Sequence, residues 1–312
     1  MTHPVPAYCQ ALNDGILSAR VQQSLDALTS CTLCPRRCAV DRTAGETGFC
    51  KTGRKAVVAS YNAHYGEETP LVGRNGSGTI FFSNCNLLCN FCQNYSISHL
   101  GDGQPVDDDQ LAAMMIELQD AGCHNINLVT PSHVVPQIIS AVDIAAKQGL
   151  KLPLVYNSGG YDRTTTLKML DGIIDIYMPD FKFWNAATAQ DTCNAPDYPE
   201  VAKKALIEMH RQVGDLQIDD TSGLAYRGML VRHLVLPGGL AGTAKVMSFL
   251  ADELSRDTYV NVMSQYRPCG RAGDMPALAV SLSPLEYDQA VREANAAGIS
   301  RLDRPRRVFQ LW

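Results

Sequence analysis

Three cysteines in one short segment restrict this 312-residue chain more than any other feature of its sequence. Cys85, Cys89 and Cys92 lie in "SNCNLLCNFCQNYS", residues 83–96, with the spacing C-x3-C-x2-C. A structural zinc ion usually takes four protein ligands, so a loop with three thiolates leaves one coordination position open. We therefore expect this loop to hold a metal centre that also binds a substrate or a cofactor.

The chain has eleven cysteines, and four others form a second group in "CTLCPRRCAVDRTAGETGFC" with the spacing C-x2-C-x3-C-x11-C. These are Cys31, Cys34, Cys38 and Cys50. Four thiolates can complete a zinc tetrahedron or hold an iron–sulfur cluster, and the spacing leaves both open. The isolated cysteines are predicted to be small buried hydrophobic residues; they are Cys9, Cys123, Cys193 and Cys269.

The composition is that of a globular protein, with 46% hydrophobic and 19% charged residues. The net charge of −5 gives no sign of a nucleic-acid-binding protein, which is usually basic. No apolar run approaches the roughly 18 residues of a membrane-spanning helix, and the first residues lack the pattern of a signal peptide. We expect a cytoplasmic protein that binds neither nucleic acid nor a membrane, and whose reduced thiols bind metal.

Apolar strands and helices alternate along the central part of the chain. Strands are predicted at 78–83, 125–130, 152–157, 172–178, within 227–239 and at 259–266. Helices are predicted at 106–122, 132–149, 163–170, 198–214 and 242–255, with a small hairpin insertion at 215–228. This alternation predicts an α/β fold with a parallel sheet and helical crossovers. A doubly wound sheet and a β/α barrel both satisfy it.

Polar residues at the strand ends favour a partial (β/α)6 TIM-like barrel. In such barrels the working residues lie at the carboxyl ends of the strands. Here the cysteine loop follows the first strand, and "TPSH", "NSGG", "PDFK", "PGG" and "SQYRP" follow the next five. The candidate binding residues in these segments are Thr130, Ser132, His133, Asn157, Ser158, Asp180 and Lys182.

We divide the chain into three parts on this basis. Residues 1–65 form an N-terminal cysteine-rich, metal-binding extension, irregular apart from a helix near 24–30. Residues 66–270 form the barrel core, and residues 271–312 form a C-terminal helix and tail.

The three-cysteine loop after the first strand of a β/α barrel resembles that of the radical S-adenosylmethionine (SAM) superfamily. Phe91, directly before the third cysteine, also fits the family pattern. The resemblance implies that Cys85, Cys89 and Cys92 hold a catalytic 4Fe–4S cluster whose open iron binds SAM. Reductive cleavage of SAM in that family yields a 5′-deoxyadenosyl radical, which abstracts hydrogen from a substrate. The alternative is a zinc site that uses His99 as a fourth ligand.

Within the superfamily the chain is most similar to homologues of pyruvate formate-lyase activating enzyme, in the PflX-type branch. The similarity rests on residues 76–99, 127–138, 156–183 and 263–268. It implies that Asp180 and Lys182 contact the carboxylate region of SAM or a monovalent cation there, and that Met178 helps to bind this cation. It also implies a flavodoxin- or ferredoxin-like reductant and a glycyl-radical partner protein or a peptide.

The sequence departs from the family pattern after the second strand. Where the family has Gly-Gly-Glu to bind the SAM amino group, this chain has "VTPSHVVP", so Thr130, Ser132 and His133 are expected to supply the acceptors. A histidine at a helix start without a ligand role is the alternative for His133. Gln93 follows the third cysteine in place of a family histidine. These departures bear on the substrate rather than on the cluster.

Three functions follow from these motifs. The first is a radical SAM oxidoreductase that activates a glycyl-radical enzyme. The second is a radical SAM enzyme that modifies a peptide or a small molecule directly. The third, from a different class, is a non-catalytic iron–sulfur protein for electron transfer or redox sensing, and it would not cleave SAM.

Overall fold

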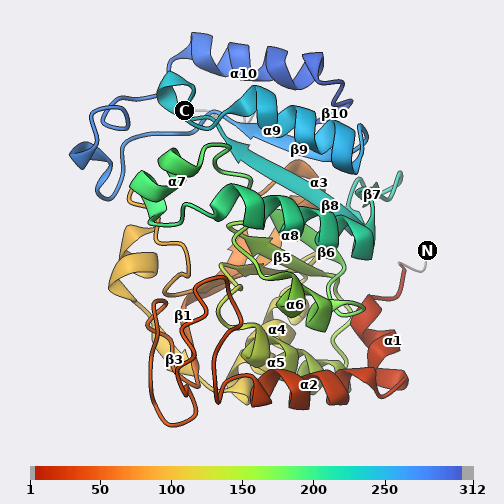
Figure 1. Ribbon diagram of the computed structural model, residues 1–312. Coiled ribbons are helices and arrows are strands. Elements are labelled where there is room, and N and C mark those ends of the chain that lie inside the picture. Colours follow the sequence, from red (N-terminus) through yellow and green to blue (C-terminus); the bar gives the residue numbers. More distant parts are fainter. Residues whose placement is uncertain (1–3, 304–312) are drawn as a thin grey trace, which may run out of the picture.

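The computed structural model describes residues 4–303, and these residues contain a 10-stranded sheet with six parallel strands at its centre (Figure 1). The six strands are neighbours in chain order, and each lies where a strand was expected. They are β2 (Ser77–Phe82), β4 (Ile126–Val129), β5 (Leu154–Ser158), β6 (Ile176–Pro179), β8 (Ala225–Leu234) and β9 (Tyr259–Met263). The predicted partial (β/α)6 barrel is therefore confirmed.

The sheet does not close, because its two end strands do not pair with each other. At one end β1 (Ala56–His64) pairs antiparallel with β2, and β3 (Gln104–Val106) pairs antiparallel with β1. At the other end β10 (Arg301–Leu302) pairs parallel with β9. None of these three strands was predicted. β1 falls within the predicted 1–65 extension, so this extension contributes a strand to the barrel sheet.

Helices cover the outer face of the sheet, where alternate strand residues such as Ile126 and Leu128 pack against them. The opposite set of strand residues, among them Val155, Ile176 and Leu230, forms a separate cluster inside the barrel. The helices along this part of the chain are α3 (Thr69–Val72), α4 (Asp108–Asp120), α5 (Val135–Lys147), α6 (Thr164–Leu167), α7 (Ala186–Cys193), α8 (Tyr198–Val213) and α9 (Thr243–Phe249). Short 3-10 and π turns extend α6 over Lys168–Leu170 and α9 over Leu250–Leu254.

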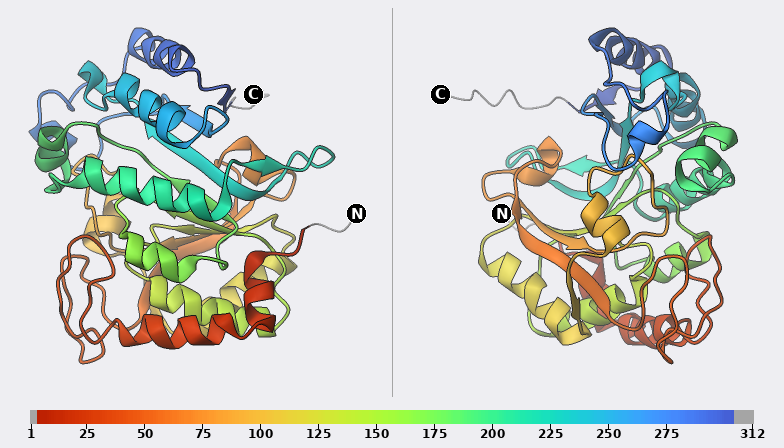
Figure 2. Two further views of the ribbon diagram at one scale, coloured as in Figure 1. Left: turned by 45° about the vertical axis from the view of Figure 1, so that its right-hand side comes forward. Right: turned by 90° about the vertical axis from the view of Figure 1, so that its left-hand side faces the viewer.

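The two ends of the chain add helices at opposite ends of the molecule. α1 (Ala7–Asn13) and α2 (Ile16–Asp26) pack beside α5, whereas α10 (Pro284–Ala296) packs beside α9 (Figures 1 and 2). The expected helix near 24–30 is wrong in its position, because α2 ends at Asp26 and turns follow up to Cys31. The predicted C-terminal helix corresponds to α10, and residues 304–312 of the predicted tail lie outside the described residues.

Two further expectations concern the hairpin and membrane-spanning segments. β7 (Gln217–Ile218) pairs antiparallel with β8, which confirms the small hairpin at 215–228. No helix within residues 4–303 has the length and apolar character that crossing a bilayer requires.

A buried carboxylate joins the N-terminal helices to the barrel. Asp175 accepts hydrogen bonds from the backbone N–H of Ala7 (2.7 Å) and from that of Leu154 at the start of β5 (2.9 Å). Burial raises the pKa of Asp175 to about 7, even though these two hydrogen bonds oppose the shift. Folding therefore favours the protonated form of this side chain.

Replacing Asp175 with Asn should change how stability depends on pH. The folded-state pKa lies above the unfolded value, so the stabilisation from this group is complete below about pH 4 and is lost as the pH rises to about 7. Asn cannot ionise, so the Asp175→Asn variant should gain stability relative to the wild type over this range, by about 1.4 kcal/mol per unit of pKa shift. Denaturant unfolding of both proteins at about pH 4 and about pH 7 measures this. A difference in unfolding free energy that is the same at the two pH values would contradict the prediction.

Candidate active site

The loop that follows β2 has a strained backbone. Asn84 and Leu88 adopt left-handed conformations with φ values of 68° and 53°, and Thr130 at the end of β4 does the same with φ 62°. Such conformations cost on the order of 1–3 kcal/mol for residues other than glycine and concentrate at functional sites. The turns at Asn84 and Leu88 bring the three cysteines of the loop together at the carboxyl end of the parallel strands.

Each sulfur of the loop has at least one hydrogen-bond donor beside it. Cys85 accepts from the N–H of Leu87 (3.3 Å), Cys89 from the thiol of Cys193 (3.1 Å) and Cys92 from the hydroxyl of Ser98 (3.3 Å). Hydrogen bonds to the cysteine sulfurs are one means by which proteins set the reduction potential of an iron–sulfur cluster. Cys193, predicted only as a buried hydrophobic residue, thus belongs to the site.

The thiols also affect one another electrostatically. Burial, and then the nearby Cys89 and Cys92, raise the pKa of Cys85 to about 12. The thiol–thiol contact with Cys193 and then burial raise the pKa of Cys89 well above its usual range. Three sulfurs that are close enough to interact, each with a donor, fit a 4Fe–4S cluster with one iron left open. This fit comes from the arrangement of the thiols and their donors.

A group of charged side chains lies inside the barrel beside this loop. Arg232 on β8 donates from Nε to Asp180 Oδ1 (2.8 Å) and from Nη2 to Asn157 Oδ1 (2.6 Å). The ammonium of Lys182 pairs with the other carboxylate oxygen of Asp180. The structure therefore brings together Asn157, Asp180 and Lys182 as predicted, and adds Arg232. An arginine inside the apolar run "MLVRHLVL" was the sequence signal that could have identified it.

The charges in this group stabilise one another. Burial alone would raise the pKa of Asp180, but Arg232 and Lys182 hold it below the usual range. Burial alone would lower the pKa of Lys182, but Asp180 and then Cys89 raise it. Asp180 is therefore ionised and Lys182 is charged, and Lys182 lies near the thiol of Cys89.

Two of the predicted binding residues, Ser132 and Ser158, form hydrogen bonds with Asp162 and not with the ion group. Ser158 Oγ donates to Asp162 Oδ2 (2.6 Å), and Ser132 also hydrogen-bonds to Asp162. Asp162 is buried and accepts a further hydrogen bond from Tyr156 (2.9 Å). The structure therefore gathers both serines around an internal carboxylate rather than around Asp180.

His133 is buried beneath the cysteine loop. Its Nε2 lies 2.9 Å from the carbonyl oxygen of Ser83, the residue after β2. Burial and the nearby Arg42 lower its pKa to about 4, so the ring is neutral. Its Nδ1 is buried without a hydrogen-bond partner among the described residues, and the role of His133 stays a prediction.

Phe91 and Met178, two further predicted residues, are both buried. Phe91 packs edge-on against Phe183 (5.9 Å between ring centroids) and Tyr266 (6.0 Å). Met178 belongs to the inner cluster and lies opposite Asn157 in the strand register.

His99, the alternative zinc ligand, lies in the π turn Ser96–Leu100. Its ring stacks on Tyr95 (4.1 Å between centroids), and its Nδ1 lies 2.8 Å from Ser98 Oγ. His99 is therefore linked to Cys92 by the hydroxyl of Ser98, which lies within hydrogen-bonding distance of both.

The N-terminal cysteines also form a group. Cys31, Cys34 and Cys50 are buried, and Cys38 is half-buried. Burial, and then the other three cysteines, raise the pKa of Cys34 to about 12. Over the described part of the chain, no three Cys, His, Asp or Glu side chains are placed as ligands of a single metal ion. A second metal site at these four thiols stays a prediction.

Arginines join the N-terminal cysteine segment to the barrel. The guanidinium of Arg36 lies over the ring of Phe49 (3.9 Å to its centroid). It donates to four carbonyl oxygens, those of Asn86, Leu87, Cys193 and Asn194. Because Asn86 and Leu87 lie between Cys85 and Cys89, the two cysteine segments are in direct contact.

Arg42 also joins the N-terminal segment to the barrel. It is fully buried and donates to the carbonyl oxygens of Gly53 and His133.

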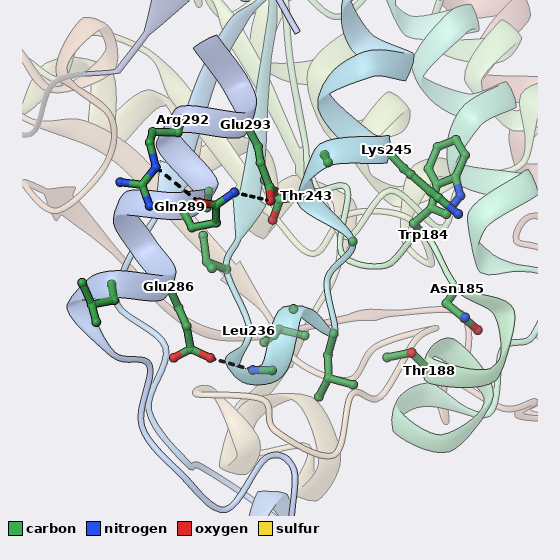
Figure 3. A pocket seen from close by; sticks show the side chains of 18 residues that line it. Trp184, Asn185, Thr188, Leu236, Thr243, Lys245, Glu286, Gln289, Arg292 and Glu293 are labelled. Carbon is green, nitrogen blue, oxygen red and sulfur yellow. Dashed lines mark hydrogen bonds between the residues drawn. The ribbon is translucent and has the colours of Figure 1, made fainter. Parts of the chain in front are cut away.

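A cavity of about 840 Å³ lies outside the barrel, between α10 and the loop after β8 (Figure 3). Trp184 and Asn185 line one side, and Glu286 on α10 accepts a hydrogen bond from the N–H of Gly238 (2.7 Å). None of the predicted site residues is among the described residues that line it. A second cavity, of about 680 Å³, includes Arg232 in its wall.

Comparisons with known proteins identify the fold. No protein-family model matches the chain. The chain is 29% identical over 287 residues to the uncharacterized protein MJ0674 of Methanocaldococcus jannaschii, a match that covers 89% of this chain and 78% of the relative. A radical SAM methyltransferase from Sphaerobacter thermophilus has a similar structure, with a TM-score of 0.50 and 15% identity over 73% of this chain and 67% of that one. The chain therefore shares the partial-barrel fold of that enzyme.

Replacing Arg36 with Met should separate the two cysteine segments. The variant leaves four carbonyl oxygens without their charged donor, so unfolding should require about 1.5–3 kcal/mol less free energy. Arg37→Met is the matched control, because Arg37 is exposed and should tolerate the change within about 0.5 kcal/mol. Denaturant unfolding of both variants measures the difference, and equal stability would show that Arg36 is not a link.

Proposed function

We propose that this chain is a radical SAM enzyme. The observation that carries the proposal is the loop of three hydrogen-bonded thiols at the carboxyl end of β2, beside the ion group of Asp180, Lys182 and Arg232. When bound, a 4Fe–4S cluster and SAM supply the electron and the 5′-deoxyadenosyl radical for hydrogen abstraction. The shared fold supports the proposal.

The three cysteines have the role of cluster ligands, and the fourth coordination position stays open for SAM. Lys182 is charged and lies near Cys89, so it can bind the SAM carboxylate directly. Asp180 is ionised and can bind the SAM amino group or, with Met178, a monovalent cation. Arg232 is a positioning residue, since it holds the Asp180 carboxylate from the neighbouring strand.

The ion group distinguishes this proposal from a non-catalytic electron carrier. A carrier needs only the cluster ligands and a protecting environment. Buried charges are costly unless they are paired, and Asp180, Lys182 and Arg232 are all largely buried next to the cysteine loop. In the proposed enzyme these charges bind the carboxylate and amino groups of SAM.

The narrower form of the proposal is an activating enzyme. In it, the hydrogen comes from a glycine of a partner protein, and a flavodoxin- or ferredoxin-like protein supplies the electron. The resemblance in residues 76–99 and 156–183 supports this form, as does a barrel sheet that is open at one edge. The N-terminal thiols are proposed to hold zinc or a second iron–sulfur cluster.

Removing the three loop thiols should abolish the activity. The variant with Ala at Cys85, Cys89 and Cys92 should neither bind the cluster nor produce 5′-deoxyadenosine from SAM after anaerobic reconstitution and reduction with dithionite. Cys9→Ala is the control and should keep both, because Cys9 lies on α1, with its thiol 3.8 Å from the carbonyl oxygen of Leu150. Iron analysis and chromatography of 5′-deoxyadenosine measure the outcome. Cleavage retained by the triple variant would refute the assignment.

Replacing Asp180 with Asn should weaken SAM binding without loss of the cluster. A charge-assisted contact contributes about 1.5–3 kcal/mol, so the dissociation constant should rise about tenfold or more. Asp171→Asn is the matched control, because Asp171 forms a surface ion pair with Arg211 (2.6 Å). Calorimetry on proteins of equal iron content tests this, and equal affinity in wild type and Asp180→Asn would leave Asp180 with a structural role only.

A further inference from the structure

We propose that the substrate carries a cationic group, an ammonium or a guanidinium, which binds Glu67 and Glu68 in the cavity at the open edge of the barrel. The inference names a substrate class for the proposed radical SAM activity and rests on it.

The cavity lies where the sheet does not close. Its volume is about 680 Å³, and it lies between residues 65–73, which follow β1, and residues 261–265 of β9 and the loop after it. Arg232 on β8, Tyr287 on α10 and Asp303 after β10 also line it. Segments from both ends of the open sheet therefore meet around one cavity.

This cavity shares wall residues with the surroundings of the candidate active site. Arg232 lines it and is also the partner of Asp180. Gln265 lines it too, and its carbonyl oxygen accepts a hydrogen bond from Gln93, the residue after Cys92 (3.4 Å). A molecule in the cavity would therefore contact residues that are bonded directly to the ion group and to the end of the cysteine loop.

The charges in the cavity wall favour a cation. Among the described residues that line the cavity, Glu67, Glu68 and Asp303 are acidic, and the one basic residue is Arg232, which already pairs with Asp180. Glu67 also lies 3.4 Å from Nδ1 of His64. Arg232 Nη1 is 3.9 Å from Glu67. The rim adds the ring of Tyr65, which is 62% exposed, and aromatic rings attract cations by their faces.

Glu68 provides an independent sign of a ligand. It is only 5% exposed, and its Oε1 accepts a hydrogen bond from Asn261 (2.9 Å). Its Oε2 is buried and has no hydrogen-bond partner. Burial raises the pKa of Glu68 and Glu67 adds to the rise, although Arg232 opposes it. A buried carboxylate oxygen without a partner is costly, and a donor with positive charge supplies what this one lacks.

The test measures binding of small cations to the reconstituted full chain under anaerobic conditions. The probes are Nα-acetyl-lysine amide and Nα-acetyl-arginine amide, each with a neutral analogue of similar size, Nα-acetyl-norleucine amide and Nα-acetyl-citrulline amide; acetylation removes the charge of the α-amino group, so only the side chain is cationic. We expect each cation to bind about tenfold or more tightly than its analogue in calorimetry. Equal affinity for cation and analogue would overturn the proposal.

Variants locate the binding. Glu68→Gln and Glu67→Gln should each remove the preference for the cation, whereas Glu253→Gln, which changes an exposed residue of the π turn after α9, should keep it. In the absence of probe, Glu68→Gln should melt at the same or a higher temperature, because it removes a buried charge without a full set of partners. A Glu68 with only a structural role would instead give a lower melting temperature and an unchanged preference, and this result would overturn the inference.

Two further outcomes distinguish a failure of this inference from a failure of the proposed function. Magnesium chloride alone serves as a probe for a metal ion, and Glu68-dependent binding of Mg²⁺ without binding of the amides would overturn the inference in favour of a metal site. The amide experiment does not require SAM cleavage. A protein that cleaves SAM but shows no cation preference refutes only this inference, whereas a cation preference with an intact cluster and no cleavage refutes only the proposed function.

Discussion

The buried ion pair between Arg232 and Asp180 connects most of the site. It joins β8 to the end of β6, and Arg232 also reaches Asn157 on β5 and Glu67 at the open edge. Lys182 completes the group beside the cysteine loop. Buried ion pairs are often no more stabilising than apolar contacts, so stability alone does not explain three charges in the barrel interior. The proposed binding of a charged cofactor and of a cationic substrate would give these charges a function.

The two cysteine segments form one assembly. Arg36 holds the backbone between Cys85 and Cys89, and Arg42 links the N-terminal segment to His133 under the end of β2. The strained turns at Asn84 and Leu88 are thus supported from the N-terminal side. The metal proposed at the N-terminal thiols would make this support rigid and would thus have a structural role next to the three-cysteine loop.

The sequence predicted what depends on local patterns. Near-continuous apolar runs located the six parallel strands, and the cysteine spacing, with Asp180 and Lys182 after a strand, located the site. Contacts between distant segments were not predictable in this way. The second half of β1 is largely exposed and becomes a strand through its pairing with β2. Ser132 and Ser158 belong to Asp162 because that carboxylate is buried between them. No sequence pattern marks Glu68 as a candidate site residue, because its place in a cavity wall depends on contacts between distant segments.

The most direct test of the account is the electron paramagnetic resonance spectrum of the reduced, reconstituted protein with and without SAM. If the three-thiol loop holds a 4Fe–4S cluster with one open iron, binding of SAM to that iron changes the environment of the cluster. Saturating SAM should alter the spectrum of the wild-type protein. A full complement of four cluster irons with a spectrum that SAM leaves unchanged would contradict it.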